Sequence, residues 1–302
     1  MPSERPSLYL IDGSSYIFRA FFALPPLTNS SGLPTHAIYG FTNMTLKFIK
    51  QYRPEYLGVV LDAGRETFRN EIYRAYKRNR PEAPADLIPQ FPYIRTALHA
   101  LSVRMLEQEG FEADDIIATL AQNFSSQGVE VIVVSGDKDL MQLVADGIKL
   151  LDSAKEKWIG AEEIREKFGV EPQKVIEVMG LMGDSVDNIP GVKGIGEKTA
   201  TALIQKYHTL ENLFDHLNDL ETIGLKGVSR IRAALLEGRE SAFLSRELAT
   251  VRRDIPIQVQ LEEFRYSGPD NSKLRELFAE LEFHHLLKTL DAPEPGKGQQ
   301  PS

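Results

Sequence analysis

Short apolar runs that end in an acid or a turn recur through the first half of the chain. They lie at residues 7–12, 56–62, 101–106, 129–134 and 148–151. Between these runs, apolar residues at helical spacing, such as those within 113–126, predict amphipathic helices. Strands that alternate with helices are typical of an α/β fold with a mostly parallel central sheet flanked by helices.

After about residue 160 the strand pattern stops and helical patterns follow. Gly191, Gly194 and Gly196 lie between two predicted helices within residues 183–204. Glycines in such a turn let backbone N–H groups approach a phosphate closely at the positive end of the next helix. With GluLysThrAla directly after them, the pattern predicts a helix-hairpin-helix, which holds the DNA backbone without reading base sequence. Residues 226–232 are a weaker candidate for a second such turn.

These patterns predict four parts of the chain. We expect an α/β core over residues 1–183, including a helical arch at about 65–90. A helix-hairpin-helix domain is expected over 184–260, and a C-terminal segment over 261–290 that packs on the core. The polar, Pro/Gly-rich residues 291–302 are expected to form a disordered tail or a linker.

Composition narrows the class of protein. The 302 residues are 42% hydrophobic and 26% charged, which is ordinary for a globular protein. No apolar run is long enough for a membrane span, and the first residues lack the apolar centre of a signal peptide. The absence of cysteine excludes disulfides and thiolate metal sites, and the histidines show no zinc spacing. We therefore expect a cytoplasmic protein without a membrane partner. A monomeric state is a separate expectation.

Acids follow several of the predicted strands. Because parallel strands end at one edge of a sheet, we expect these side chains to converge there. Each acid alone has an ordinary explanation, as a helix-start or turn residue. Together they would repel one another unless a cation lies between them, and carboxylates suit Mg²⁺ or Mn²⁺. The acids at this edge are Asp12, Asp62, Glu112, Asp114, Asp115, Asp137 and Asp139, and Asp184 and Asp187 lie one helical turn apart in the later part.

The net charge of −8 argues at first sight against binding of nucleic acid. If metal ions neutralise nine acids, however, the rest of the chain has a balance of +1. Residues 65–80, called the basic segment below, hold six basic and two acidic side chains with aromatics between them. Either this is a solvated basic helix, or it contacts phosphates and stacks bases.

The motifs together resemble one family. The pieces IleAspGlySerSerTyr, GluAlaAspAsp, SerGlyAspLysAspLeu and GlyAspSerValAspAsnIleProGlyValLysGlyIleGlyGluLysThrAla are similar to those of 5′ nucleases (flap endonucleases). The similarity is greatest to the N-terminal 5′→3′ exonuclease domains of bacterial DNA polymerase I and covers roughly residues 6–290. It implies a PIN-like nuclease core and a bacterial, cytoplasmic protein.

The resemblance implies roles for individual residues. All nine acids named above would bind two Mg²⁺ ions, which Mn²⁺ can replace; the first seven mainly serve one site, and the last two serve a second with acids of the middle group. Lys77 and Arg80 would be catalytic, and Tyr76 would stack a base. A K⁺ ion is expected at the helix-hairpin-helix. The candidate DNA-contacting residues are Tyr76, Arg69, Gly191, Lys193, Gly194, Gly196, Lys198 and Thr199.

The implied function is hydrolysis of phosphodiesters near 5′ ends, as a 5′→3′ exonuclease and flap endonuclease in replication and repair. Its substrates would be DNA with 5′ flaps, nicks or 5′ ends, and RNA–DNA primers. A polymerase domain in the same chain would be a partner, or the nuclease would stand alone. Two alternatives remain open: a DNA-binding relative without catalysis, and a Mg²⁺-dependent phosphohydrolase acting on small molecules.

Overall fold

The computed structural model describes residues 5–291. The tail expected at 291–302 lies outside the described residues, apart from Asp291. Among residues 5–291, no helix combines the length and apolar character needed to cross a membrane.

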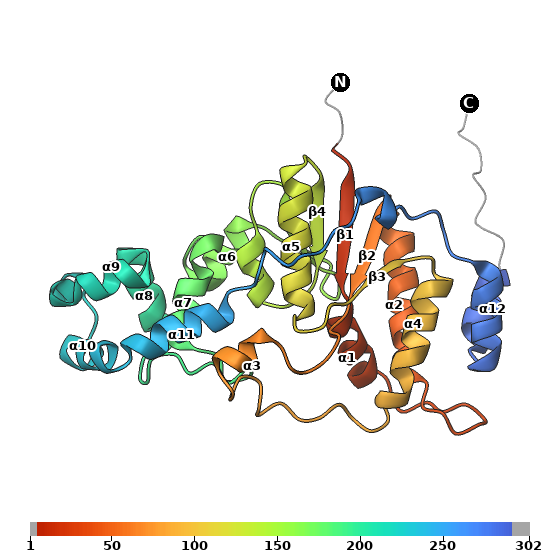
Figure 1. Ribbon diagram of the computed structural model, residues 1–302, viewed down its shortest axis with the longest axis horizontal. Helices are drawn as coiled ribbons and strands as arrows, with labels where there is room; N and C mark the ends of the chain where they lie inside the picture. Colours follow the sequence, from red (N-terminus) through yellow and green to blue (C-terminus); the bar gives the residue numbers. More distant parts are fainter. Residues whose placement is uncertain (1–4, 292–302) are drawn as a thin grey trace.

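A six-stranded sheet forms the centre of the molecule (Figure 1). The strand order is β3-β2-β1-β4-β5-β6, and every neighbouring pair is parallel except β5 with β6. This confirms the predicted fold class. The sequence missed β6, which is too short to show a pattern and returns from β5 by a tight turn. The strands are β1 (Ser7–Asp12), β2 (Tyr56–Val60), β3 (Arg104–Leu106), β4 (Glu130–Val134), β5 (Ile148–Asp152) and β6 (Lys157–Ile159).

Helices cover both faces of the sheet because alternate strand residues are apolar on each side. Ile11 and Leu57 point to one core, which packs against α1 (Gly13–Ala23), α2 (His36–Tyr52), α4 (Phe91–Ala100), α12 (Asn271–Glu280) and α13 (His284–Asp291). Leu8 and Leu10 point to the other core, with α5 (Ala113–Ser126). Asp12 follows the alternation of Leu8 and Leu10, so the strand directs it to the α5 side.

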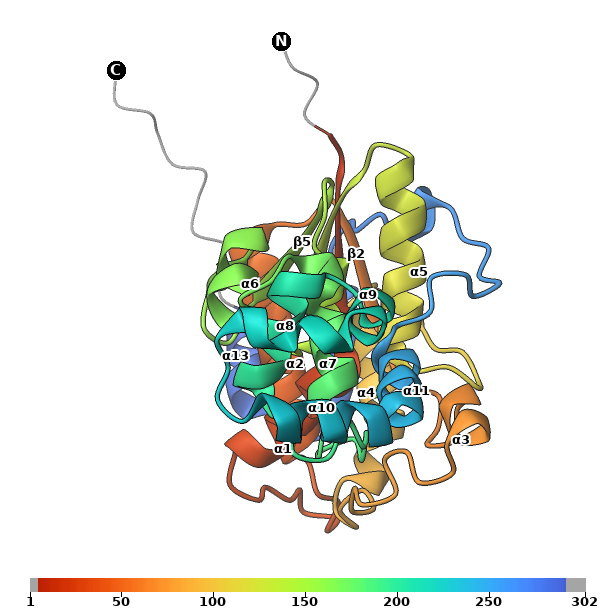
Figure 2. The ribbon, with the colours of Figure 1, turned by 90° about the vertical axis from the view of Figure 1, so that its left-hand side faces the viewer.

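A helical part continues the core on the α5 side (Figures 1 and 2). It contains α6 (Ala161–Phe168), α7 (Val175–Met182), α8 (Glu197–Tyr207), α9 (Leu210–Asp215), α10 (Val228–Glu237) and α11 (Arg239–Ala249). Short 3-10 helices lie at Ile88–Gln90, Asp139–Leu143, Pro172–Lys174, Leu217–Ile223 and Leu261–Phe264.

The stretch 65–90 differs from the helical arch that the sequence led us to expect. Its helices are α3 (Phe68–Ile72) and the 3-10 turn at Ile88–Gln90, and turns and extended chain connect them. Lys77 has a φ of 52°, in the left-handed region, which a continuous right-handed helix excludes. Pro81 and Pro84 then remove backbone donors.

A candidate metal and nucleic-acid site

The site lies at the carboxyl ends of β1, β2 and β4, where the helix after each strand begins. Asp12 ends β1 and caps α1, since its Oδ1 accepts a hydrogen bond from the N–H of Ser15 at 2.9 Å. Its Oδ2 accepts from the hydroxyl of Ser135, just past β4, at 2.8 Å. Asp12 is therefore fixed between two strand ends, with both carboxylate oxygens oriented by the protein.

Asp62 ties the end of β2 to the start of α5. Its Oδ1 accepts from the N–H of Ala113 at 2.8 Å, and its own N–H donates to the hydroxyl of Ser14 at 2.9 Å. This places Asp62 at the first residue of α5, which Asp114 follows. Burial raises the pKa of Asp114 well above its usual value, and the negative charges of Asp137 and Asp12 raise it further. These carboxylates are therefore close enough to repel one another.

A second group of acids adjoins the first. Asp139, Asp184 and Asp187 each offer a carboxylate oxygen within 4.8 Å of the others. Asp139 begins the 3-10 helix after β4, and the other two lie in the loop after α7. Burial raises the pKa of Asp139 to about 7, and Asp137 adds to the shift. The second group therefore joins acids of the sheet to acids of the helical part.

The donor set fits a divalent cation. The Oδ1 atom of Asp139 is buried and has no hydrogen-bond partner in the described part of the chain, which is costly unless a cation binds it. Burial also raises the pKa of Asp12 to about 6; hydrogen bonds from Ser15 and Ser135 oppose the shift, and Asp62 and Asp137 increase it. A hard cation that accepts oxygen ligands would relieve this repulsion.

Besides Arg69, which is described below, three basic side chains pair with the acids. Lys77 Nζ lies 2.7 Å from Glu112 Oε2 and 3.7 Å from Asp187 Oδ2, and Arg80 is hydrogen-bonded to Asp187. Lys77 and Arg80, predicted from the sequence, are thus at the cluster. The third cation is Lys138. Sequence reasoning missed it, although it lies inside the SerGlyAspLysAsp motif.

Lys138 acts on the second group of acids. Its Nζ lies 2.5 Å from Asp184 Oδ2. Burial, the largest single influence, would raise the pKa of Asp184, but the hydrogen bond and charge of Lys138 together with backbone N–H groups of Val186 and Asp187 outweigh it, so the pKa is lowered. Asp184 is therefore held ionised beside the protonatable Asp139.

Asp115 is placed differently from the other predicted ligands. Its side chain is fully buried, and Arg69 donates to both of its oxygens at 2.6 and 2.7 Å. Its oxygens also accept from the N–H groups of Arg252 (2.7 Å) and Glu112 (3.2 Å). These hydrogen bonds occupy the Asp115 carboxylate in this structure, and Arg69 is only 2% exposed. Metal binding by Asp115 and DNA contact by Arg69 therefore stay predictions. The two residues form a buried ion pair behind the cluster.

Tyr76 also departs from expectation. It is 4% exposed, and its hydroxyl donates to Glu112 Oε2 at 3.2 Å. In this arrangement the ring packs inside the protein and offers no face to a base. The sequence could not show this, because the turn at Lys77, rather than a helix, directs Tyr76 inward.

The hairpin between α7 and α8 exposes most of its predicted contact residues. Lys193, Gly194, Gly196 and Lys198 are exposed and Thr199 is half-buried. In the described part of the chain, no hydrogen-bond partner takes the N–H groups of Gly194 and Gly196. They are therefore available to a ligand at the start of α8.

Gly191, by contrast, serves packing. Its N–H donates to the hydroxyl of Ser245 at 2.8 Å, and its carbonyl accepts from the hydroxyl of Ser241 at 2.6 Å. Its backbone N–H and carbonyl are thus occupied by α11 in this structure, and its direct contact with DNA stays a prediction.

Gly191→Ala is expected to lower the free energy of unfolding by about 2 kcal/mol or more, because overpacking and a positive φ both penalise a side chain. A Cβ at this position would meet the backbone N of Gly183 at 2.5 Å, and the φ is +62°. Urea denaturation measures the effect. Gly196→Ala is the matched control, since its Cβ would enter open space; equal destabilisation by both changes would contradict the packing role.

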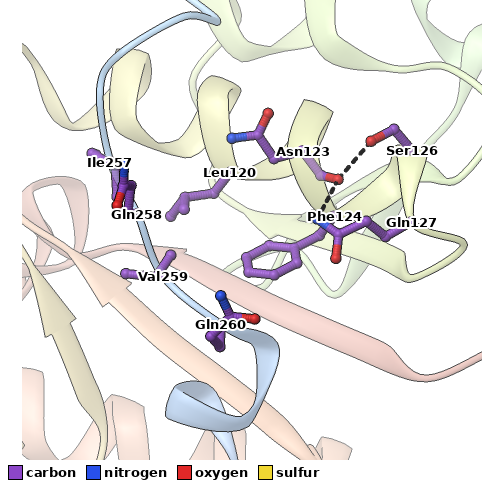
Figure 3. Close-up of a pocket in the computed structure, with 9 residues that line it drawn as sticks. All are labelled: Leu120, Asn123, Phe124, Ser126, Gln127, Ile257, Gln258, Val259 and Gln260. Carbon is purple, nitrogen blue, oxygen red and sulfur yellow. Dashed lines mark hydrogen bonds between the residues drawn. The ribbon is translucent and has the colours of Figure 1, made fainter.

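A separate cavity lies at the other end of α5 (Figure 3). It is lined by Leu120, Asn123 and Phe124 of the helix, by Gln127 directly after it and by residues 257–260 of an extended segment. No charged side chain lines it, and the carboxylates lie at the opposite end of the helix. It is therefore not part of the acidic site.

Two family descriptions match consecutive parts of the chain, from residue 7 to residue 272. Residues 7–169 match "5′-3′ exonuclease, N-terminal resolvase-like domain", and residues 170–272 match "5′-3′ exonuclease, C-terminal SAM fold". The chain is 42% identical over 294 residues to DNA polymerase I of Bacillus caldotenax, covering 96% of this chain and 33% of that protein. It is 41% identical over 285 residues to a 5′-3′ exonuclease of Aquifex aeolicus, covering 94% of this chain and 95% of that protein.

Solved structures share the fold. The T5 5′-exonuclease with bound zinc ions has a TM-score of 0.64 at 21% identity, covering 93% of this chain and 98% of its own. The catalytic core of Rad2 in complex with a DNA substrate has a TM-score of 0.64 at 19% identity, covering 96% of this chain and 92% of its own. At these identities the likeness shows a common architecture, from the sheet to the helical part.

Proposed function

The chain belongs to the 5′-3′ exonuclease family, and on that basis we propose that it hydrolyses phosphodiesters near 5′ ends of DNA as a metal-dependent exonuclease and flap endonuclease. The membership confirms the family that the sequence predicted. The chain spans about a third of the polymerase relative (33%) and nearly all of the Aquifex exonuclease (95%). Polymerase partnership, action on RNA–DNA primers, a cytoplasmic location and a monomeric state remain predictions.

The observation that supports the proposal most strongly is that the two groups of acids lie next to each other. Asp137 raises the pKa of Asp12 and Asp114 in the first group and of Asp139 in the second. A continuous array of carboxylates thus runs from the sheet edge to the loop before the hairpin. Such an array supports binding of two divalent cations close together, the arrangement that suits cleavage of a phosphodiester.

We assign the ligands by group. Asp12, Asp62, Glu112, Asp114 and Asp137 would hold one cation, and Asp139, Asp184 and Asp187 the other. Mg²⁺ is the proposed metal, with Mn²⁺ as a substitute, because all donors are hard oxygens. When bound, these cations supply Lewis acidity toward phosphate oxygens and lower the pKa of water.

The basic side chains have two tasks in this proposal. Without metal, Lys77, Arg80 and Lys138 form ion pairs with the carboxylates and hold them in place. With the acids neutralised by cations, Lys77 and Arg80 would instead face the scissile phosphate and stabilise its developing charge. The exposed turn at Gly194 and Gly196 would hold the duplex through backbone N–H groups and the positive end of α8. A K⁺ ion at this hairpin rests on the family resemblance alone.

The proposal is tested with a 5′-labelled flap duplex in Mg²⁺ and in EDTA. Short 5′-terminal products that depend on Mg²⁺ are expected. Binding of the duplex without any cleavage would favour the inactive DNA-binding relative. Hydrolysis of p-nitrophenyl phosphate without cleavage of the duplex would favour the small-molecule phosphohydrolase.

The pH dependence of stability gives a further prediction. The pKa values of Asp139 and Asp12 are raised to about 7 and about 6 in the folded protein. Between about pH 4 and about pH 7 the folded state therefore holds protons that the unfolded chain has released, so the metal-free protein loses stability as the pH rises through this window. Mg²⁺ favours the deprotonated acids. It should therefore raise Tm more at about pH 8 than at about pH 5. Thermal unfolding in Mg²⁺ and in EDTA measures both effects, and equal shifts at the two pH values would contradict the prediction.

A further inference from the structure

A cavity of about 620 Å³ lies between α3 and α11, which are neighbours in Figures 1 and 2. Phe68 of α3 lines one side. Phe243, Arg246 and Glu247 of α11 line the other, and Arg252, just after α11, lies at its edge. Its volume is in the range of pockets that hold small organic groups. None of the roles proposed above uses it.

The cavity is close to the acid cluster but separate from it. Phe68 precedes Arg69, whose Nη1 lies 3.7 Å from Glu112 Oε2. The N–H of Arg252 donates to Asp115, the partner of Arg69. One buried ion pair therefore separates the cavity from the carboxylates.

The helix α11 also separates the cavity from the hairpin. Ser241 and Ser245, which bind Gly191, are four residues apart and share one helix face. Phe243, Arg246 and Glu247, at spacings of three and four, share another face and line the cavity. One face of α11 therefore contacts the hairpin, and another face lines the cavity.

The side chains that line the cavity offer a cation, a hydrogen-bond acceptor and aromatic rings. The guanidinium of Arg252 lies over the ring of Phe68, 4.8 Å from its centroid, and forms no ion pair with a described carboxylate. Arg246 lies over Phe243 but is already neutralised by Glu177 and Glu211. A guanidinium placed over a ring in this way can stack with a base and offer its N–H groups to a phosphate.

Glu247 makes the cavity unsuitable for a plain anion. It is exposed and forms no ion pair among the described residues. Its carboxylate would repel a free phosphate but can accept hydrogen bonds from ring N–H or amino groups of a base. One free cation, one free acceptor and aromatic walls together match a nucleotide whose base is unpaired. The bases of a duplex are paired and stacked, so they would not present these groups.

We propose that this cavity binds an unpaired nucleotide of the 5′ single-stranded flap, while the hairpin holds the duplex. Arg252 contacts the flap and stacks on its base, and Glu247 accepts hydrogen bonds from that base. The assignment rests on the proposed function, because it names where the flap of that substrate lies. It adds a binding site for the flap outside the carboxylate cluster.

The test measures binding in Ca²⁺, with two fluorescently labelled duplexes that differ in one feature. One is nicked, and the other has an oligothymidine 5′ flap at the nick. For the wild-type protein we expect tighter binding of the flap duplex. The preference is expressed as the ratio of the two Kd values. Arg252→Gln is expected to lower this ratio about tenfold, since stacking and cation contacts to one base are of this size. Phe68→Leu, which removes the support of the guanidinium, should act in the same direction.

The variants are chosen to keep the fold. Arg252 is exposed, and its bond to Asp115 comes from its backbone, so Arg252→Gln leaves that bond intact. Arg165→Gln, an exposed arginine of α6 paired with Glu171, is the matched control and should keep the wild-type ratio. The proposal is overturned if the flap adds no affinity, or if Arg252→Gln weakens binding of both duplexes equally. Failure of the proposed function would appear separately, as absence of cleavage of either duplex by the wild-type protein in Mg²⁺.

Discussion

Asp139→Asn is expected to lower the rate of flap cleavage in Mg²⁺ by about 10³-fold or more, since several kcal/mol of transition-state stabilisation depend on the bound metal. Asp139 lies among Asp184 and Asp187 within 4.8 Å, and its Oδ1 has no partner among the described residues. The asparagine keeps the shape of the side chain and loses its charge. Asp137→Asn and Asp184→Asn are expected to behave in the same way.

The same substitution should not destabilise the metal-free protein. In EDTA the pKa of Asp139 is raised to about 7 by burial and by Asp137, so its charged form opposes folding near neutral pH. An uncharged side chain removes this repulsion. We therefore expect Tm in EDTA to stay equal or rise while activity falls, as at other sites where function conflicts with stability.

Asp146→Asn is the matched control for both measurements. Asp146 is an exposed acid in the turn before β5, with its side chain 98% exposed. It should keep wild-type activity and Tm. Cleavage of the flap duplex by Asp139→Asn at the wild-type rate would exclude Asp139 from the metal site.

The position of the acids was predictable because it follows from topology. Parallel strands end at one edge, so Asp12, Asp62 and Asp137 had to come together once the strands were recognised. The pairing of individual side chains was not predictable. Asp114 and Asp115 are neighbours in sequence, but one residue of an α-helix turns the side chain by about 100°. Asp114 therefore points to the acids, while Asp115 points to a distant arginine.

The conformation of the basic segment was also not predictable from the sequence, although its location was. Its charge and its aromatic residues correctly indicated proximity to the cluster, because Lys77 and Arg80 both contact acids there. Its shape depends on contacts with a distant loop: the N–H of Lys77 donates to the carbonyl of Asp187, and Asn188 donates to that of Ala75. Local pattern cannot reveal such contacts, which fix the turn and bury Tyr76.

The buried pair of Arg69 and Asp115 leads to the largest expected loss of stability. Arg69 also donates to the carbonyls of Leu248 (2.9 Å) and Thr250 (3.0 Å), so it joins α3, α5 and the end of α11. Arg69→Met leaves a fully buried carboxylate without its partner. We expect the free energy of unfolding to fall by about 3–5 kcal/mol, the range for breaking a buried pair from one side.

The control is an exposed pair of the same type. Arg104 lies 2.9 Å from Glu263, with both side chains about 40% exposed (41% and 38%). Arg104→Met should cost less than about 1 kcal/mol, because solvent screens such pairs. Chemical denaturation in EDTA measures both variants. The double variant Arg69→Met with Asp115→Leu should recover part of the loss, since it removes the unpaired charge.

The free energy of unfolding without metal should distinguish a carboxylate that is paired within the protein, such as Asp115, from one that would bind a metal, such as Asp139. Asp115→Asn should lower the free energy of unfolding in EDTA, because it weakens contacts with Arg69 and with the N–H of Arg252. Asp139→Asn should not, because among the described residues no donor forms such a hydrogen bond with its carboxylate. In Mg²⁺ the order reverses: Asp115→Asn should keep the metal-dependent rise in Tm, and Asp139→Asn should lose much of it. If Asp115→Asn instead leaves stability in EDTA unchanged and abolishes the rise in Mg²⁺, Asp115 is a metal ligand and its pairing with Arg69 gives way when metal binds.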